Sequence, residues 1–299
     1  MKQKQIPELY IKENLEKETK QFYKFLHHQK FPQHRYMILE SLPGLKKNLK
    51  SKIKLSKKDE LKIIKQFISE FRKNHQIKIN LIIKKSQQLN KTKFKKSIKI
   101  LAELMDYQWP NKKIVYTAIP TILPFSPFEN PTFYFSILGQ IYGKSAKQRD
   151  IIFVAIHEIS HFLLFDILEK IYQKPLEKII SSTSLYFLKE AITPALMNQS
   201  KMNKILKLKK YRGNPNVKYI RIKFSNKIMT LTELLSQIYI QRKNKEKKDF
   251  EEIIKEMIQI IKSIEPEINK RDELWNKFGG SLIKNKKLFR KYANPIKIK

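Results

Sequence analysis

The sequence predicts an α+β fold that is predominantly helical, with a small β-sheet beside one buried helix and helical regions on both sides of that core. Apolar residues recur at helical spacing along most of the chain. Two short runs, residues 114–119 and 132–138, are rich in β-branched and aromatic residues, as strands are. Residues 150–168 are apolar on nearly all sides of a helix, which is typical of a helix buried in a protein core.

The chain has 299 residues, which is enough for one large domain or two modest ones. We divide it into an N-terminal helical region, residues 1–106, a core, residues 107–200, and a C-terminal, mostly helical region, residues 201–299. The sequence contains no cysteine. Disulfides and thiolate metal sites are therefore excluded, and histidine and carboxylate remain as the strong metal ligands.

In the N-terminal region, apolar spacing predicts helices over about residues 10–28, 56–71 and 93–106. Ser56 is placed to cap the second helix, and Pro43-Gly44 marks a turn before it. Residues 77–83 fit a strand or a helix. Four histidines here fall outside any ligand spacing, and we expect them to be surface or amphipathic residues: His27, His28, His34 and His75.

In the core, a proline-rich loop separates the two predicted strands. Ser145 and Gln148 form a capping-box signature, which predicts that the buried helix begins there and ends near Tyr172. A second helix is expected over about residues 182–198.

In the C-terminal region we expect four further features in order. They are a strand over residues 217–224, a capped helix from Thr230 to about Arg242, a helix over residues 248–264, and short helical pieces around Leu274 and Leu288.

The buried helix carries the pattern His157-Glu158-x-x-His161. Two histidines four residues apart project from one face of a helix, one turn apart, close enough to bind one metal ion. Glu158 lies about 100° further round, where it can reach a metal-bound water without being a ligand. A zinc hydrolase uses this arrangement to generate and aim a hydroxide.

Buried imidazoles and a buried carboxylate need polar partners, and a metal ion with its activated water supplies partners to all three. The alternative is that the three side chains bond one another, or nearby backbone, as polar groups of the core.

The H-E-x-x-H run resembles the active-site helix of the zincin metallopeptidases. The extended metzincin pattern is absent, because Leu164 and Ile167 stand where it has a glycine and a third histidine. The gluzincin branch takes its third ligand from a downstream helix, and Glu190 is the candidate there. Asp166 and Glu169 are nearer in sequence, but they point away from the histidine face by roughly 140° and 80°.

The resemblance implies a Zn²⁺ ion held by His157, His161 and Glu190, with Glu158 as general base and a peptide or protein as substrate. In zincins an edge strand lies alongside the active-site helix and can pair with extended substrate. The predicted strand over residues 132–138, which precedes the H-E-x-x-H helix, is similar to that arrangement, and the alternative is a simple strand of an α+β core. Pro194 predicts a kink that turns the Glu190 carboxylate toward the histidines. A donor for the developing oxyanion is needed as well, and the candidates are Tyr186, Tyr211, Arg212 and Tyr219.

The net charge of +36 invites a nucleic-acid interpretation. However, only eight of the 63 basic residues are arginine and the lysines are spread along the whole chain, which favours a coding bias with lysine as the default surface residue. Nonspecific binding to polyanions should follow from the charge whatever its origin. Two rival functions stay open. One is a non-catalytic basic scaffold or nucleic-acid-associated protein with a structural or vestigial metal helix, and the other is a zinc hydrolase acting on a non-peptide amide or ester.

The first ten residues have no apolar core of signal-peptide length, and the longest apolar run is interrupted by His157 and Glu158. We therefore expect a soluble, cytoplasmic protein without a membrane span.

Overall fold

The computed structural model describes residues 5–29, 32–50, 55–143, 150–208, 210–214, 217, 220–273 and 294–298. It is mostly helical, with two small sheets, which confirms the predicted helix-rich α+β class. The chain separates into two compact units that are interleaved in sequence. Unit 1 comprises residues 1–6, 96–112 and 156–299, and unit 2 comprises residues 7–95 and 113–155. The linear division into residues 1–106, 107–200 and 201–299 stays a prediction.

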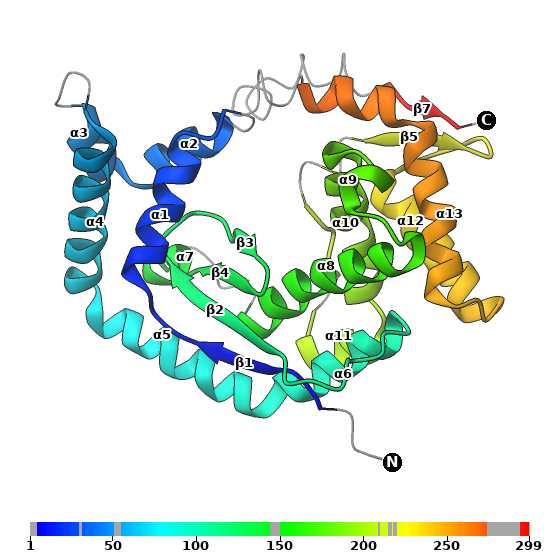
Figure 1. Cartoon of the computed structure of the whole chain (residues 1–299), viewed down its shortest axis with the longest axis horizontal. Helices are drawn as coiled ribbons and strands as arrows, with labels where there is room; N and C mark the ends of the chain where they lie inside the picture. Colours follow the sequence, from blue (N-terminus) through cyan, green and yellow to red (C-terminus); the bar gives the residue numbers. More distant parts are fainter. Residues whose placement is uncertain are drawn as a thin grey trace. The chain divides into compact units, whose positions relative to one another are not determined.

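Unit 2 is built around a four-stranded sheet with the order β1-β2-β4-β3 (Figure 1). The strands are β1 (Glu8–Ile11), β2 (Val115–Thr121), β3 (Phe128–Glu129) and β4 (Thr132–Ser136). β2 is parallel to both β1 and β4, and the short β3 is antiparallel to β4. Pairing between β1 and β2 joins segments that lie more than 100 residues apart in the chain.

The helices of unit 2 follow β1 in the chain, and α1 packs against α2 and α4. They are α1 (Leu15–Leu26), α2 (Pro32–Ser41), α3 (Pro43–Lys50), α4 (Lys57–Asn74), α5 (Gln76–Leu89), the π-helical turn η1 (Asn90–Phe94) and α7 (Leu138–Ile141). Phe22, Ile64 and Ile68 are fully buried where α1 meets α4.

Glu18 of α1 is the buried polar centre of unit 2. Its Oε2 accepts hydrogen bonds from Arg72 Nε at 3.0 Å and Arg72 Nη2 at 2.7 Å, and its Oε1 accepts one from the Ile122 N–H at 2.8 Å. Arg72 also donates to the Pro120 carbonyl at 2.7 Å. The ion pair thus ties α1 and α4 to the end of β2.

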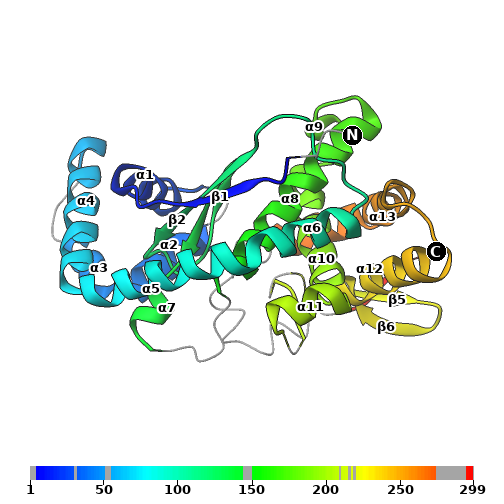
Figure 2. The same ribbon diagram turned by 90° about the horizontal axis from the view of Figure 1, so that it is seen from below.

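Unit 1 contains most of α8 (Ile151–Tyr172), one helix that precedes it in the chain and the helices that follow it. These are α6 (Lys95–Leu104), α9 (Leu176–Ile179), α10 (Ser182–Met197), α11 (Ser200–Leu206), α12 (Leu231–Tyr239), the π-helical turn η3 (Ile240–Lys245) and α13 (Phe250–Ser263). Figure 2 shows α10 beside α12, and α10 also packs against α13. A small sheet of order β6-β5-β7 is formed by β5 (Arg221–Phe224), β6 (Lys227–Thr230) and β7 (Ile296–Lys297).

Most predicted elements are present. Ser56 caps α4 by accepting the Asp59 N–H, and Thr230 forms a complete capping box with Glu233 at the start of α12. The predicted strands appear as β2 and β4, the ambiguous residues 77–83 lie within α5, and the strand expected over residues 217–224 is shorter, as β5. α12 ends at Tyr239 and continues as a π-helical turn.

Two local predictions are wrong. Tyr10 lies in strand β1 rather than at the start of a helix, because it pairs with Thr117 of β2. Pro43 begins helix α3 instead of a turn, since proline is also well suited to the first position of a helix. The helical pieces around Leu274 and Leu288 lie outside the described residues, as does the capping box of Ser145 and Gln148.

Within the described part of the chain, α8 is the helix that is long and apolar enough to cross a membrane by length and composition. However, 78% of its 18-residue apolar window is buried inside the protein, as in the core helix of a soluble protein. Its hydrophobicity is therefore accounted for by burial in the fold, as the sequence predicts.

Candidate metal centre

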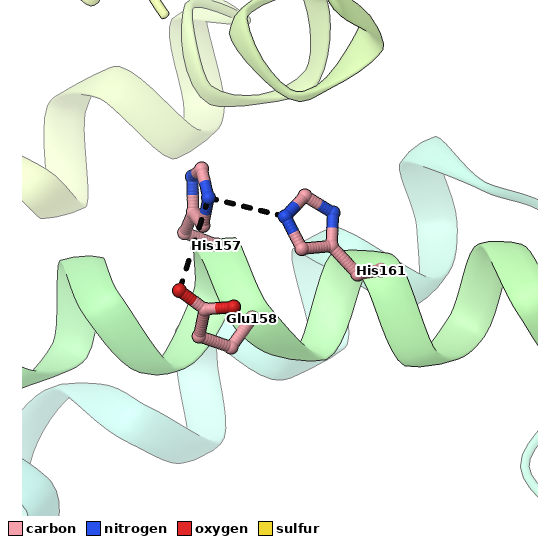
Figure 3. A group of neighbouring side chains, drawn as sticks. All are labelled: His157, Glu158 and His161. Atoms are coloured by element: carbon pink, nitrogen blue, oxygen red, sulfur yellow. Dashed lines mark hydrogen bonds and ion pairs between the residues drawn. The ribbon is translucent and has the colours of Figure 1, made fainter. Parts of the chain in front are cut away.

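Helix α8 brings the two histidines of the motif together. Asp150 caps the described start of this helix by accepting the Phe153 N–H at 2.9 Å. The Nε2 atoms of His157 and His161 face each other at 3.1 Å (Figure 3), and the imidazole centroids are 4.6 Å apart. The side chain of His161 is 1% exposed and that of His157 is 12% exposed. The helix therefore presents two converging ring nitrogens from a nearly buried face.

Helix α10 supplies the Glu190 carboxylate to the same place. Glu190 Oε1 lies 3.4 Å from His161 Nε2, and Oε2 lies 3.7 Å from His157 Nε2. The two helices are also linked one turn further along, where the hydroxyls of Ser160 and Thr193 lie 3.3 Å apart. Glu190 thus stands at the position that the sequence assigns to the third ligand, although the helix that carries it is distant in the chain.

These three side chains have the spacing of ligands around a small metal ion. Ligand atoms at 2.0 to 2.1 Å from a tetrahedral zinc are separated from one another by roughly 3.3 to 3.4 Å. In the structure the two Nε2 atoms are 3.1 Å apart, and they lie 3.4 and 3.7 Å from Oε1 and Oε2 of Glu190, respectively. These separations lie close to that value, although the two carboxylate distances involve different oxygens. His157, Glu158 and His161 also form a group that could hold a metal ion, with ligand atoms within 4.8 Å of one another.

Glu158 lies beside the histidine pair rather than between its members. Its Oε1 is 3.9 Å from His157 Nε2 (Figure 3), and its side chain is 7% exposed. Burial raises the pKa of Glu158 well above its ordinary value, and the negative charge of Glu190 adds to that effect against the opposing charge of Lys189. A carboxyl with a raised pKa is a stronger base, which suits it to accept a proton near neutral pH.

The pKa of Glu190 is shifted in the opposite direction from that of Glu158. Burial by itself would raise its pKa, but Lys189, His161 and His157 together hold the pKa of this carboxyl well below its ordinary value. Burial lowers the pKa of His161 to about 4, with a further contribution from the charge of Lys189. At neutral pH the site therefore offers an ionised carboxylate and a neutral imidazole, the forms in which these residues bind metals.

Tyr211 lies on the other side of His157. Its hydroxyl is 3.3 Å from His157 Nδ1, the ring nitrogen that faces away from His161. The Tyr211 backbone is fixed by Asn198, whose side chain accepts the Tyr211 N–H at 2.8 Å and donates to the Tyr211 carbonyl at 2.7 Å. Such a contact orients a ligating imidazole and selects its tautomer. Tyr211 is thus placed to position His157, and its role as an oxyanion donor stays a prediction.

The segment that carries Tyr211 approaches α10 closely at Gly213. This glycine has a φ of +76°, and a Cβ added to it would lie 2.8 Å from the side chain of Pro194. A larger residue would therefore be strained here by its backbone and by its neighbour. Helix α10 runs through Pro194 from Ser182 to Met197, and the predicted kink stays a prediction.

Two of the other three predicted oxyanion donors lie in the described part of the chain. Tyr186 is bonded through its hydroxyl to Asn214 Nδ2 at 3.1 Å, Arg212 is exposed, and Tyr219 is outside the described residues. Asp166 is 42% exposed and pairs with Lys170 at 2.6 Å on the same helix, and Glu169 is exposed. Neither acidic residue competes with Glu190 as a ligand.

Lys189 is a residue of this cluster that was not predicted from the sequence. Its Nζ donates to Glu190 Oε1 at 2.6 Å within the protein interior. In a chain with lysine as its ordinary surface residue, a lysine beside a candidate ligand carries no signal of its own. The apolar residues that surround it on α10, however, indicate a helix that is buried on most sides.

Comparison of the chain with protein-family models, with curated proteins and with solved structures finds no match. The resemblance to zincins consequently stays a prediction that rests on this chain's own residues.

Proposed function

We propose that the protein is a zinc-dependent metallopeptidase of gluzincin type, with His157, His161 and Glu190 as the ligands. The observation that carries this proposal is the convergence of two imidazole nitrogens and a carboxylate at separations of 3.1, 3.4 and 3.7 Å. When bound there, zinc would polarise a scissile carbonyl and lower the pKa of a coordinated water to about 7.

Glu158 is the general base in this proposal. It accepts the proton of the attacking water and passes it to the leaving amine. Its burial and raised pKa, opposite to the lowered pKa of Glu190, support a division of roles between the two carboxylates. Tyr211 holds His157 in orientation through Nδ1.

The proposed substrate is a peptide or protein, and the proposed compartment is the cytoplasm. The side chain of His157, 12% exposed, is the most accessible of the three proposed ligands. We therefore expect a substrate segment to approach the site from the His157 side. Nonspecific association with polyanions is expected from the charge of +36 and does not bear on the reaction.

The test combines metal analysis with one pair of variants on α8. The purified protein should contain close to one zinc per chain and should cleave an unstructured protein such as casein. Glu158→Gln should keep the zinc and lose activity by about 10²- to 10⁴-fold, since it removes the base alone. Glu169→Gln changes an exposed carboxylate on the same helix and should leave both properties unchanged.

Cleavage that survives Glu158→Gln would remove Glu158 from the role of base. Metal-free protein without cleavage would remove the whole proposal. In that case the cluster would be a set of core polar groups in a basic scaffold.

A further inference from the structure

Lys189 is a buried charge next to the candidate metal centre. It is 8% exposed, and among the described residues it is the one lysine that is buried. Its Nζ lies 2.6 Å from Glu190 Oε1 and 5.2 Å from the centroid of the Tyr186 ring. Removing an ammonium group from water costs several kcal/mol unless it is well paired. The position thus needs a specific reason for its charge.

The pairing uses the two oxygens of Glu190 differently. Oε1 accepts from Lys189 and also lies 3.4 Å from His161 Nε2, whereas Oε2 is the oxygen nearest His157, at 3.7 Å from its Nε2. A carboxylate held at one oxygen by a fixed cation keeps a defined rotation about its last side-chain bond. Carboxylate ligands of metals are commonly fixed by such a hydrogen bond, and loss of the outer partner typically weakens metal binding.

We propose that Lys189 is a positioning residue that clamps Glu190 through Oε1 and so aims the carboxylate at the two imidazoles. The inference rests on the metal centre of the proposed function, but not on peptide hydrolysis. A lysine suits this place because its ammonium is a compact charge on a flexible stem that reaches along the same helix. Ring contact with Tyr186 gives the ammonium a second favourable neighbour.

The test measures metal binding directly. Co²⁺ serves as the probe because its visible absorption reports the geometry of its ligands, and Zn²⁺ affinity follows by competition. Lys189→Met keeps the length of the side chain and removes the charge, and it should weaken binding of both metals by about 10- to 100-fold and change the Co²⁺ spectrum. Lys189→Arg keeps a donor for Oε1 and should recover most of the affinity.

Lys201→Met is the matched control, since Lys201 is a 72% exposed lysine paired with Glu103 in the same unit. It should bind Co²⁺ as the unaltered chain does. A folded Lys189→Met protein with unchanged affinity and spectrum would overturn the proposal and leave Lys189 as a neutralising charge only. If Lys189→Met does not fold, Lys189→Leu also removes both the charge and the donor and is read in the same way.

The outcomes separate the two proposals. Metal binding that depends on Lys189 in a chain without peptidase activity supports the clamp and removes the peptidase. Peptidase activity together with metal binding that does not depend on Lys189 supports the peptidase and removes the clamp. An unaltered chain that binds neither Co²⁺ nor Zn²⁺ overturns both.

Discussion

Each unit of this protein buries a carboxylate that is paired with a basic side chain, and these two carboxylates, Glu18 and Glu190, are bonded in different ways. In unit 2, Glu18 is fully buried and accepts three hydrogen bonds, two from Arg72 and one from the Ile122 N–H. In unit 1, Glu190 accepts one strong bond from Lys189 and otherwise faces His157 and His161. Glu18 is bonded by hydrogen-bond donors at both oxygens, whereas Glu190 and the two imidazoles direct their polar atoms toward one common position.

The difference separates a structural ion pair from a candidate set of metal ligands. All groups that face Glu18 are donors, so its charge is compensated within the protein. Around Glu190, a carboxylate oxygen that only accepts meets imidazoles that each have one accepting nitrogen when neutral. Converging acceptors repel one another unless a proton or a cation lies between them. Burial alone therefore does not indicate function, whereas the kind of partner does.

The largest effect is expected from breaking the ion pair of unit 2. Glu18→Ala leaves the Ile122 N–H without its acceptor and removes two hydrogen bonds of Arg72, which keeps Glu13 as its remaining carboxylate partner. This should lower the free energy of opening of α1 and α4 by about 3 to 5 kcal/mol. Hydrogen exchange of the amides in these helices measures it. Glu16→Ala, on the same helix but exposed and paired with Lys65, should change it by less than about 0.5 kcal/mol. Equal effects of the two substitutions would contradict a structural role for Glu18.

The second prediction is that added zinc stabilises the unit that contains Glu190 and does not act through the Glu18–Arg72 ion pair. At a free concentration of about 1,000 times its Kd, zinc should raise the free energy of unfolding of unit 1 by about 4 kcal/mol. Urea denaturation with and without the metal gives this difference. Glu190→Gln should abolish most of the gain, and Glu18→Ala should leave the gain in unit 1 intact because its charge faces no metal ligand. A zinc effect that survives Glu190→Gln would show that the ion binds elsewhere.

A smaller effect concerns a second pair of histidines. In unit 2, His34 packs between Phe25 and Phe125, with ring centroids 4.9 and 4.6 Å away, and the His28 ring is 6.3 Å distant. His34 is partly buried, which agrees with the prediction of a surface or amphipathic residue. Burial, with a contribution from the charge of His28, lowers the pKa of His34 from 6.5 to about 4.

The lowered pKa of His34 makes the free energy of unfolding depend on pH in a defined direction. Protonation of His34 is easier in the unfolded chain than in the folded one, so its contribution is fully present above about pH 6.5 and is lost as the pH falls toward 4. The loss by pH 4 is at most about 3 kcal/mol, from 1.36 kcal/mol for each unit of pKa. His34→Phe should remove this part of the pH dependence, measured as the stability of both proteins between pH 7 and 4. Parallel curves would contradict the shift.

Much of the fold could be predicted from the sequence where the controlling interactions are local. The caps at Ser56 and Thr230 depend on a side chain bonding an amide three residues away, so the sequence shows them directly. Strand β1 could not be predicted in this way, since Tyr10 becomes a strand residue by pairing with a segment more than 100 residues distant. Pro43 was ambiguous because proline suits both a turn and the first position of a helix.

The same distinction between local and long-range interactions applies to the residues of the candidate site. The facing of His157 and His161 follows from helical geometry alone, because residues four apart lie one turn above each other. Glu190 could be nominated by its position in the chain, but only the packing of α10 beside α8 brings it within 3.4 Å of His161. Lys189 and Tyr211 enter through contacts that no spacing predicts.

The sequence by itself determined which side chains one helix holds in common, since the helical repeat is set by backbone hydrogen bonds. Only the tertiary structure decided how Glu190 is held at Oε1 and which group orients His157. It also decided that Glu18, unlike Glu190, is bonded by donors at both of its oxygens. These depend on how separate helices pack, and packing is decided by burial over many residues rather than by any motif.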